Sequence, residues 1–193
     1  MSRLVLVRHA EPEEDARGRV YGTLDVGLSP AGREQARRLA EVLPRLPVHS
    51  SPRRRALETA RALGVEPVVD PDLREIDFGE LEGRRYEEIE RTEPELFRAW
   101  MQTPTEVRFP GGESYADLRV RALRALESIR RRQVCAVVVT HGGVVRAGLA
   151  AWLEMPDAAI FRLAQDYCGV SVVDWIDETP LVRAVNARLD HVV

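Results

Sequence analysis

The chain has 193 residues, of which 45% are hydrophobic and 31% are charged, which suits one domain with a sizeable core. Its 28 basic and 31 acidic side chains give a formal net charge of -3, which offers no sign of nucleic-acid or membrane binding. Cys135 and Cys168 are far apart, and the sequence has no His-x-x-x-His or Cys-x-x-Cys pair. We therefore expect no disulfide framework, no metal and no other cofactor.

The N-terminus and the hydropathy pattern bear on location. No segment reaches the roughly 18 consecutive apolar residues of a membrane span. The chain enters an apolar strand directly after Met1-Ser2, without the layout of a signal peptide. We expect a cytoplasmic protein with no membrane partner.

The first half of the chain alternates strands and helices. An apolar run predicts a strand over residues 3–7, and a glycine-punctuated loop follows over 10–28. Ser29 suits an N-cap and Pro30 a first helical position, and the apolar spacing beyond them predicts a helix that ends near Pro44. The next expected elements are a strand at 48–50, a helix at 52–63 and a strand at 65–69.

The periodicity weakens over residues 73–112, where glycines and prolines surround two short helical segments at 86–89 and 95–101. We expect this stretch to be a small inserted cap that lies over the edge of the sheet, without a core of its own. Ser114 then caps a long helix. The remaining expected elements are a strand at 134–140, a helix at 144–154 and strands at 170–175 and 181–186. This pattern predicts a single α/β domain over residues 1–193, a three-layer α/β/α sandwich with a mainly parallel sheet.

Two histidines stand where apolar strands end. Arg8-His9 follows the first strand, and Thr140-His141-Gly142-Gly143 follows the strand at 134–140. Ligands of open α/β sheets bind at the carboxyl ends of the strands. The two histidines, with arginines nearby, therefore predict one site for a phosphoryl group, although either histidine alone could be an ordinary loop residue.

Three arginines open a predicted helix in the segment Ser51-Pro52-Arg53-Arg54-Arg55. Cations at a helix start oppose the helix dipole, so these arginines are either an exposed basic turn or part of an anion site. The planar fork of arginine suits phosphate oxygens. Gly142-Gly143 at a helix N-terminus would let a phosphate approach backbone N–H groups. Together these features favour an anion-binding role.

Five segments, in order and over nearly the whole chain, resemble the histidine phosphatase superfamily, also called the phosphoglycerate-mutase-like family. They are Leu6–Glu11, Ser51–Ala56, Leu73–Gly83, Pro110–Ser114 and Thr140–Gly143. The resemblance implies a phosphoglycerate-mutase-like fold and an enzyme whose partner is a small phosphomonoester substrate.

The resemblance also implies roles for single residues. His9 matches the nucleophile that becomes a phosphohistidine, and His141 matches a second histidine at the phosphoryl group. Arg8 and Arg55 match the two arginines that hold the phosphoryl oxygens. Glu75 matches the acid/base carboxylate, which would protonate the leaving alkoxide and then deprotonate the hydrolytic water.

Other implied contacts have a chemical alternative or depart from the family pattern. Glu75 could instead simply pair with Arg74. In relatives the position of Asp15 is usually asparagine and contacts the transferred group, as does the backbone near Gly22 and Thr23. A carboxylate at Asp15 would repel a phosphate unless a neighbouring arginine compensates, and Thr23 stands where mutases usually have an aromatic residue.

Three functions stay open. A metal-independent phosphomonoester hydrolase is favoured over a phosphoglycerate mutase, because the insertion is short and Tyr86 stands where mutases have a lysine. Arg84, Arg85 and Arg108 could still hold a carboxylate as a mutase requires, or could be solvated. A non-catalytic phosphate-binding protein would have no use for the proton donor Glu75.

Some segments of the chain also resemble the α-ribazole phosphatase branch, including residues 97–100 and 109–114. Phe78, Trp100 and Phe109 could then form an aromatic wall for a flat base, or could pack as the small core of the insertion. A homodimer is possible, and the sequence does not decide the oligomeric state.

Overall fold

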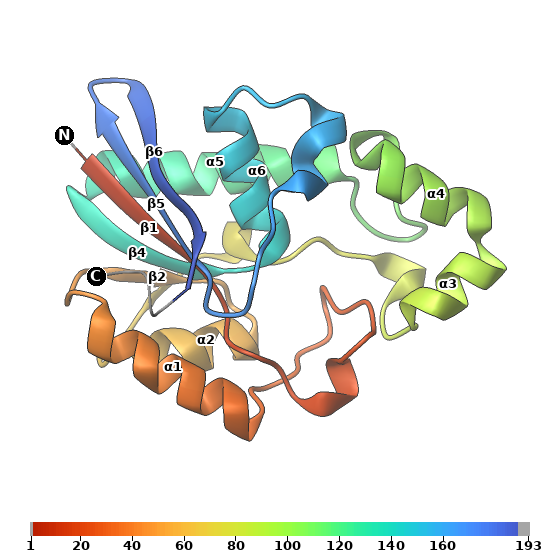
Figure 1. Cartoon of the computed structure of the whole chain (residues 1–193), viewed down its shortest axis with the longest axis horizontal. Coiled ribbons are helices and arrows are strands. Elements are labelled where there is room, and N and C mark those ends of the chain that lie inside the picture. The colour runs from red at the N-terminus through yellow and green to blue at the C-terminus, as the bar shows by residue number, and fades with distance from the viewer. Residues whose placement is uncertain (1, 189–193) are drawn as a thin grey trace.

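The computed structural model of the chain describes residues 2–188 and contains a six-stranded sheet (Figure 1). Four strands are parallel: β1 (Ser2–Arg8), β2 (Val48–Ser50), β3 (Val68–Val69) and β4 (Cys135–Thr140). β5 (Val170–Ile176) pairs antiparallel with β1, and β6 (Thr179–Ala187) pairs antiparallel with β5. The strand order β3-β2-β4-β1-β5-β6 places β4 and β1 at the centre of the sheet and confirms that it is mainly parallel.

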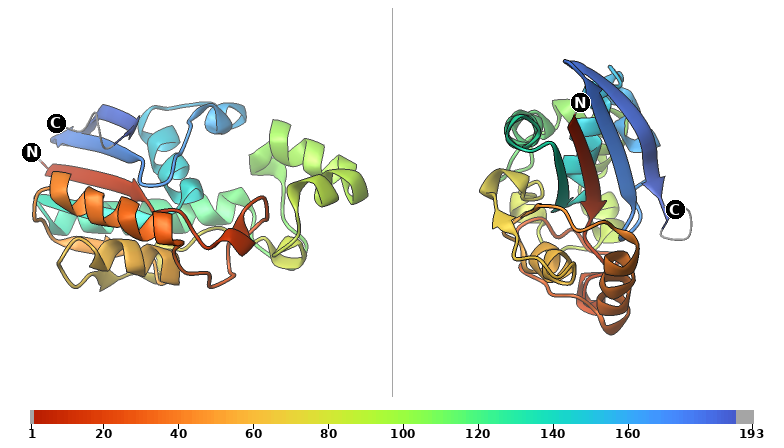
Figure 2. Two further views of the ribbon diagram at one scale, coloured as in Figure 1. Left: turned by 60° about the horizontal axis from the view of Figure 1, so that its bottom comes forward. Right: turned by 90° about the vertical axis from the view of Figure 1, so that its left-hand side faces the viewer.

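Helices cover both faces of this sheet (Figure 2). α1 (Pro30–Val42) and α2 (Arg54–Arg61) pack on one face, and α5 (Tyr115–Arg132) and α6 (Gly142–Trp152) pack on the other. Because side chains alternate along a strand, successive residues of β1 such as Leu4 and Val5 enter different cores. The predicted three-layer sandwich is therefore confirmed. Within residues 2–188, no helix combines the length and apolar character needed to cross a bilayer.

Two helices begin at the caps that the sequence predicts. Ser29 accepts a hydrogen bond from the Gly32 backbone at 2.9 Å, and Pro30 is the first residue of α1. Ser114 accepts one from the Asp117 backbone, and the Asp117 carboxylate in turn accepts one from the Ser114 backbone. Such caps satisfy N–H groups that the helix itself leaves free, and each stabilises by about 1 kcal/mol.

The extent of three elements differs from the sequence prediction. β3 has two residues rather than five, and α2 is shorter than 52–63. Val68 and Val69 are 60% and 46% exposed, so this edge strand buries too little apolar surface to extend further. α6 starts at Gly142, two residues earlier than expected, and this places the backbone N–H groups of both glycines in its first turn.

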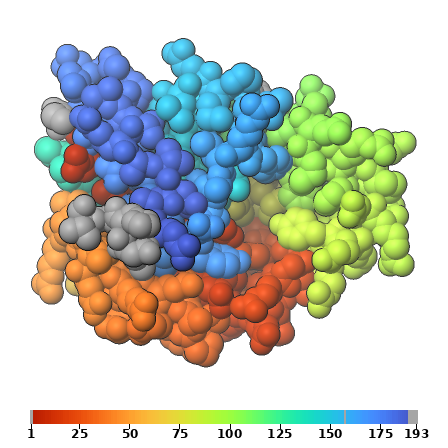
Figure 3. Space-filling view, in the orientation of Figure 1, coloured from red at the N-terminus to blue at the C-terminus, as the bar shows by residue number. Residues whose placement is uncertain are grey.

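Residues 73–112 form an insertion, built from η3 (Gly79–Leu81), α3 (Tyr86–Thr92), α4 (Pro94–Gln102) and η4 (Pro104–Glu106). The expectation that it lies over the edge of the sheet is wrong. It stands beyond the carboxyl ends of the parallel strands, at one end of the molecule (Figures 2 and 3). The reason is that it leaves from η2 (Pro71–Leu73) and returns to the start of α5, which contact each other at that end. Its buried aromatic side chains join the core beneath α5 and α6. Two further short helices, η1 (Glu14–Ala16) and η5 (Asp157–Arg162), lie in the loops after β1 and α6.

An ion pair between Glu113 and Arg121 joins the insertion to α5. The buried Arg121 donates to both carboxylate oxygens of Glu113, at 2.8 and 2.6 Å. It also donates to the backbone carbonyls of Asp72, Arg74 and Glu75. Burial is the largest single influence on the pKa of Glu113 and would raise it, but the hydrogen bonds and charge of Arg121, the Asp77 backbone and the charge of Arg74 together lower the pKa. The pair therefore fixes the backbone on both sides of the Arg74–Glu75 peptide.

We predict that Arg121→Met lowers the free energy of unfolding by about 3 kcal/mol, because it removes the buried partner of the Glu113 carboxylate and leaves the carbonyls of Asp72, Arg74 and Glu75 without their donor. The matched control is Arg124→Met, three residues along the same helix, where an exposed arginine pairs with Asp72. The control should cost less than about 1 kcal/mol. Urea unfolding followed by circular dichroism measures both, and equal losses in the two variants would contradict the prediction.

Candidate active site

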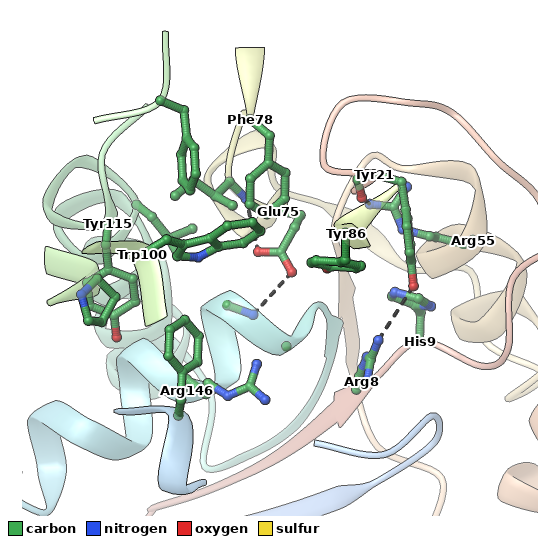
Figure 4. A pocket seen from close by; sticks show the side chains of 17 residues that line it. Arg8, His9, Tyr21, Arg55, Glu75, Phe78, Tyr86, Trp100, Tyr115 and Arg146 are labelled. Atoms are coloured by element: carbon green, nitrogen blue, oxygen red, sulfur yellow. Dashed lines mark hydrogen bonds between the residues drawn. The ribbon is translucent and has the colours of Figure 1, made fainter. Parts of the chain in front are cut away.

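A cavity of about 290 Å³ opens between the strand ends and the insertion (Figure 4). Its charged side chains come from β1, α2, the segment after η2, and α6. They are Arg8, Arg55, Glu75 and Arg146, and His9 lies among them. The aromatic side chains of its wall are Tyr21, Phe78, Tyr86, Trp100, Phe109, Tyr115 and Phe161. The cavity therefore combines a cationic end with an aromatic enclosure.

The pairing of β1 with β4 places the two predicted histidines side by side. Arg8 lies opposite Thr140, and the His9 backbone N–H donates to the Thr140 carbonyl at 2.8 Å. The rings of His9 and His141 follow directly, with centroids 5.1 Å apart. Both residues are buried. A register formed by backbone hydrogen bonds thus brings together two imidazoles that are 132 positions apart in the numbering.

His9 is held as a neutral imidazole in a defined orientation. Its Nδ1 lies 2.8 Å from the carbonyl oxygen of Ala10, and a carbonyl can only accept, so Nδ1 carries the proton. This leaves Nε2 with a free lone pair. Burial, and then the positive charges of Arg55 and Arg8, hold the pKa of His9 well below its ordinary value. Such an imidazole suits a nucleophile at neutral and mildly acidic pH.

His141 is neutral for similar reasons. Burial first, and then the charge of Arg55, hold its pKa well below the ordinary value. Its Nε2 lies 2.7 Å from the hydroxyl oxygen of Ser51, the residue that precedes the arginine segment. Ser51 also accepts a hydrogen bond from the Arg53 backbone at 3.2 Å. The hydroxyl therefore orients the second histidine from the neighbouring strand end.

Arg8 and Arg55, called the clamp arginines below, are held by hydrogen bonds from their terminal Nη nitrogens. Arg8 Nη1 donates to the carbonyl of Gln165 at 2.5 Å. Arg55 Nη1 donates to the carbonyl of Leu24 at 2.8 Å, and its Nη2 donates to the carbonyls of Tyr21 and Gly22. These bonds use terminal Nη nitrogens and leave Nε of both guanidinium groups without an acceptor among residues 2–188.

Several buried nitrogens of the arginines and histidines at the strand ends have no hydrogen-bond partner among the residues that the structure describes. They are Nε of Arg8, Nε of Arg53, Nε of Arg55 and Nδ1 of His141. Buried polar groups are almost always paired, so this cluster of unpaired nitrogens indicates a place made for an anion. The structure therefore brings Arg8, Arg55 and both histidines together as the sequence predicts.

Glu75 faces the same cavity and does not pair with Arg74. Its Oε1 accepts from the Ile76 backbone at 2.9 Å, and its Oε2 accepts from the Gly143 backbone at 3.1 Å (Figure 4). Arg74 instead donates to Glu113 at 2.8 Å. The simple ion pair considered for Glu75 is therefore not formed.

Gly143 is required for this approach, because a Cβ there would lie 2.2 Å from Oε1 of Glu75. Gly142, the first residue of α6, lines the cavity beside Arg8. A Cβ on Gly142 would stand 3.8 Å from Nε of Arg8. Because neither glycine has a side chain, the N-terminus of α6 and the Glu75 carboxylate can both border the cavity.

Three predicted contacts lie elsewhere. Asp15 is exposed in η1 and does not line the cavity. The backbone N–H groups of Gly22 and Thr23 donate to the carboxylate of Glu82, at 3.0 and 2.8 Å. A carboxylate from η3's C-terminal end thus occupies the donors that were expected to bind the transferred group. Arg54 points outward and pairs with Glu58 at 2.6 Å.

The arginines considered for a carboxylate grip also lie outside the cavity. Arg84 pairs with Glu88 at 3.1 Å, and Arg108 pairs with Asp117 at 2.6 Å. Arg85 does not line the cavity either. All three candidates are therefore separated from the reacting groups.

Sequence reasoning missed Arg146 of α6. Its Nε donates to the Leu163 carbonyl at 2.9 Å, and its guanidinium lies 5.6 Å from the ring centroid of Phe161. Nη1 and Nη2 have no acceptor among residues 2–188, and Figure 4 shows the guanidinium facing the cavity below Glu75. The sequence does contain a signal for Arg146. It lies five residues after His141, one turn into the helix that starts at the site.

Sequence reasoning also missed Tyr21 and Tyr167. Their rings lie with centroids 6.2 and 5.7 Å from that of His9. They come from the loops after β1 and before β5, where the sequence shows no periodicity. Only the folded chain brings them to the same histidine.

The aromatic residues considered as a base-binding wall pack against one another and also line the cavity. Phe78, Trp100 and Phe109 are buried against one another, with ring centroids 4.9 to 5.4 Å apart. All three also line the cavity, where Tyr86 stacks on Trp100 at 5.8 Å. Among the described residues, no three His, Cys, Asp or Glu side chains are grouped so that they could hold a metal ion.

Comparison with known proteins matches this geometry to a family. The sequence model of the histidine phosphatase superfamily (branch 1) matches residues 4–188. Phosphoserine phosphatase 1 of Hydrogenobacter thermophilus is 36% identical over 96% of this chain and 92% of its own. Glucosyl-3-phosphoglycerate phosphatase of Mycolicibacterium vanbaalenii is 38% identical over 80% of this chain and 75% of its own.

A solved structure agrees with the sequence matches. The α-ribazole phosphatase of Shigella flexneri superposes with a TM-score of 0.84 at 25% identity, and the superposition covers 96% of each chain. The family match spans the strand-end histidines, the clamp arginines and Glu75 alike. From this match and from the relatives, the chain belongs to the histidine phosphatase superfamily, branch 1, whose members named above are phosphatases.

Proposed function

We propose that this phosphatase hydrolyses small phosphomonoesters through a phosphohistidine formed on Nε2 of His9, without a metal ion. The observation that carries the proposal is the state of His9, a buried imidazole whose Nδ1 proton is committed to a carbonyl. Arg8 and Arg55 flank it with unpaired Nε nitrogens. Their charges would neutralise the phosphoryl oxygens, which is the main task in phosphoryl transfer.

In the first step, Nε2 of His9 attacks phosphorus and the bond to the leaving oxygen breaks. Glu75, in its protonated form, would give its proton to that oxygen, and the alcohol would leave. In the second step a water attacks phosphorus while the Glu75 carboxylate takes one of its protons. The phosphorus–nitrogen bond then breaks, and inorganic phosphate and neutral His9 are released. General acid–base catalysis of this kind contributes about 10²- to 10⁴-fold.

The substrate class that the cavity favours is a phosphomonoester whose leaving group carries a carboxylate. Arg146 presents two unpaired guanidinium nitrogens to the cavity beside Glu75. The names of two relatives indicate substrates with a carboxylate, phosphoserine and glucosyl-3-phosphoglycerate. An α-ribazole phosphate, by contrast, offers only a flat base to the aromatic wall. Arg146 therefore favours the carboxylated class over the α-ribazole class.

We predict that His9→Ala lowers the rate of p-nitrophenyl phosphate hydrolysis by at least about a thousandfold, because the nucleophile is lost. Wild-type activity should persist after dialysis against EDTA. The control is His49→Ala, since His49 is buried in β2 and does not line the cavity.

Acid quenching of the wild type with ³²P-labelled substrate should trap an acid-labile phosphoryl group that His9→Ala lacks. Retained hydrolysis in His9→Ala, or an EDTA-treated enzyme that needs added Mg²⁺, would contradict the mechanism. Conversion of 3- to 2-phosphoglycerate with little phosphate release would identify a mutase instead.

We predict that the acidic limb of kcat/KM lies below the ordinary histidine pKa of about 6.5. The pKa of His9 is lowered, so its neutral, nucleophilic form persists to lower pH than in a free imidazole. The profile is measured between pH 4.5 and 8.5 and corrected for the second ionisation of the substrate phosphate, which lies near pH 6.

Proton NMR of the free enzyme provides the control, with ring signals assigned through His9→Ala and His141→Ala. Both histidines should keep the chemical shifts of neutral imidazole at pH 6.5. A His9 signal that titrates with a midpoint of 6.5 or above would contradict the assignment of a neutral nucleophile.

We predict that Arg146→Met raises KM for O-phosphoserine or 3-phosphoglycerate about tenfold or more, because a charged hydrogen-bond donor to the carboxylate is lost. KM for p-nitrophenyl phosphate, which has no carboxylate, should change less than about twofold. The matched control is Arg98→Met, an exposed arginine of α4 outside the cavity. Equal effects on all substrates would reject a carboxylate contact.

A further inference from the structure

Each clamp arginine rests on the face of a tyrosine. The guanidinium carbon of Arg8 lies 4.2 Å from the ring centroid of Tyr167, and that of Arg55 lies 4.9 Å from the ring centroid of Tyr21. A guanidinium this close to an aromatic face is attracted by the ring quadrupole. Each ring therefore supports one of the two guanidinium groups on its face.

Tyr21 contacts both arginines. Its ring lies under Arg55, its backbone carbonyl accepts from Arg55 at 3.1 Å, and its hydroxyl oxygen is 3.5 Å from Nη2 of Arg8. Figure 4 shows its side chain between Arg55 and Arg8, above His9. Tyr21 thus occupies the space that separates the two phosphoryl-binding cations.

A hydrogen bond between the two tyrosine hydroxyls closes the arrangement. The oxygens of Tyr21 and Tyr167 are 3.0 Å apart. Burial raises the pKa of Tyr21, so its hydroxyl keeps its proton. Tyr21 comes from the loop after β1, and Tyr167 from the loop before β5. The bond therefore ties together two loops that approach His9 from different parts of the chain.

We infer that Tyr21 and Tyr167 act together as positioning residues that fix the geometry of Arg8 relative to Arg55. This inference rests on the proposed function, in which both arginines hold one phosphoryl group. Phosphoryl transfer depends on cations placed to match charge on the oxygens in the transition state. A small misplacement of such groups can cost up to about a hundredfold in rate. Tyr167 does not line the cavity, so it would act through the site residues that it contacts, Arg8, Tyr21 and His9.

The test compares the wild type with Tyr21→Phe, Tyr167→Phe and the double variant. Phenylalanine keeps the ring beneath each arginine and removes only the hydroxyl, so the fold and the stacking are retained. We expect kcat for p-nitrophenyl phosphate to fall about tenfold in either single variant, with KM changed less than about twofold. Both hydroxyls form one bond, so the double variant should lose no more than a single variant.

Inhibition by vanadate and by phosphate provides a readout that a purely structural role would not move. Vanadate adopts the five-coordinate geometry of the transition state, so its Ki should rise about tenfold in each variant. The Ki of inorganic phosphate should rise less than about twofold. Thermal unfolding of all four proteins checks that the variants remain folded.

Three results would overturn the inference. Unchanged kcat in both single variants would show that the hydroxyl bond positions nothing. Losses that multiply in the double variant would show independent roles. A loss confined to Tyr21→Phe would mean that Tyr21 contacts the phosphoryl group by itself. A wild type that binds vanadate and phosphate but hydrolyses no phosphomonoester would reject the proposed function, and the affinities of the variants would still test the positioning.

Discussion

The pairing of β1 with β4 is the constraint on which the site depends. Two central, parallel strands end at matching positions, with Arg8 opposite Thr140. The residue after each strand is a histidine, His9 after β1 and His141 after β4. Backbone hydrogen bonds and the burial of apolar residues on both faces enforce this register, since a one-residue slip would turn every side chain of the strand to the other core. His9 and His141 are therefore positioned by the two central strands of the sheet.

Burial of these histidines connects packing with chemistry. A buried imidazole among arginines is disfavoured as a cation, so it remains neutral and nucleophilic, and the same desolvation makes each nearby guanidinium a stronger partner for an anion. The arginines themselves are kept in place by loop carbonyls, of Gln165 for Arg8 and of Leu24 for Arg55. The strands thus position the two imidazoles, and the loops position the guanidinium groups of Arg8 and Arg55 around them.

Periodicity and capping predicted most of the fold, because β1, β4, α1 and α5 follow simple rules of burial and hydrogen bonding. The same reasoning found His9 and His141, which directly follow apolar strands. It misplaced Gly22 and Thr23, because no local pattern shows that Glu82, 60 positions later, accepts from their backbone. It missed Tyr167, whose partners are set by how a loop crosses the strand ends. Residues placed by long-range loop packing are therefore the part of the site that sequence patterns leave undetermined.

Glu75 shows how the insertion contributes a side chain to the cavity at the strand ends. The carboxylate reaches the cavity because Gly143 has no side chain, and its backbone is held by Arg121 from the middle of α5. An acid/base group must act first on the leaving oxygen and then on a water at the same phosphorus, so it has to stay in place while its partner changes. Anchoring through the backbone meets this requirement, because the two carboxylate oxygens accept from the backbone N–H groups of Ile76 and Gly143, which stay in place while the reacting partner changes. Under the proposed mechanism, this anchoring separates the aromatic side chains of the insertion, which would contact the leaving group, from the groups that would react at phosphorus.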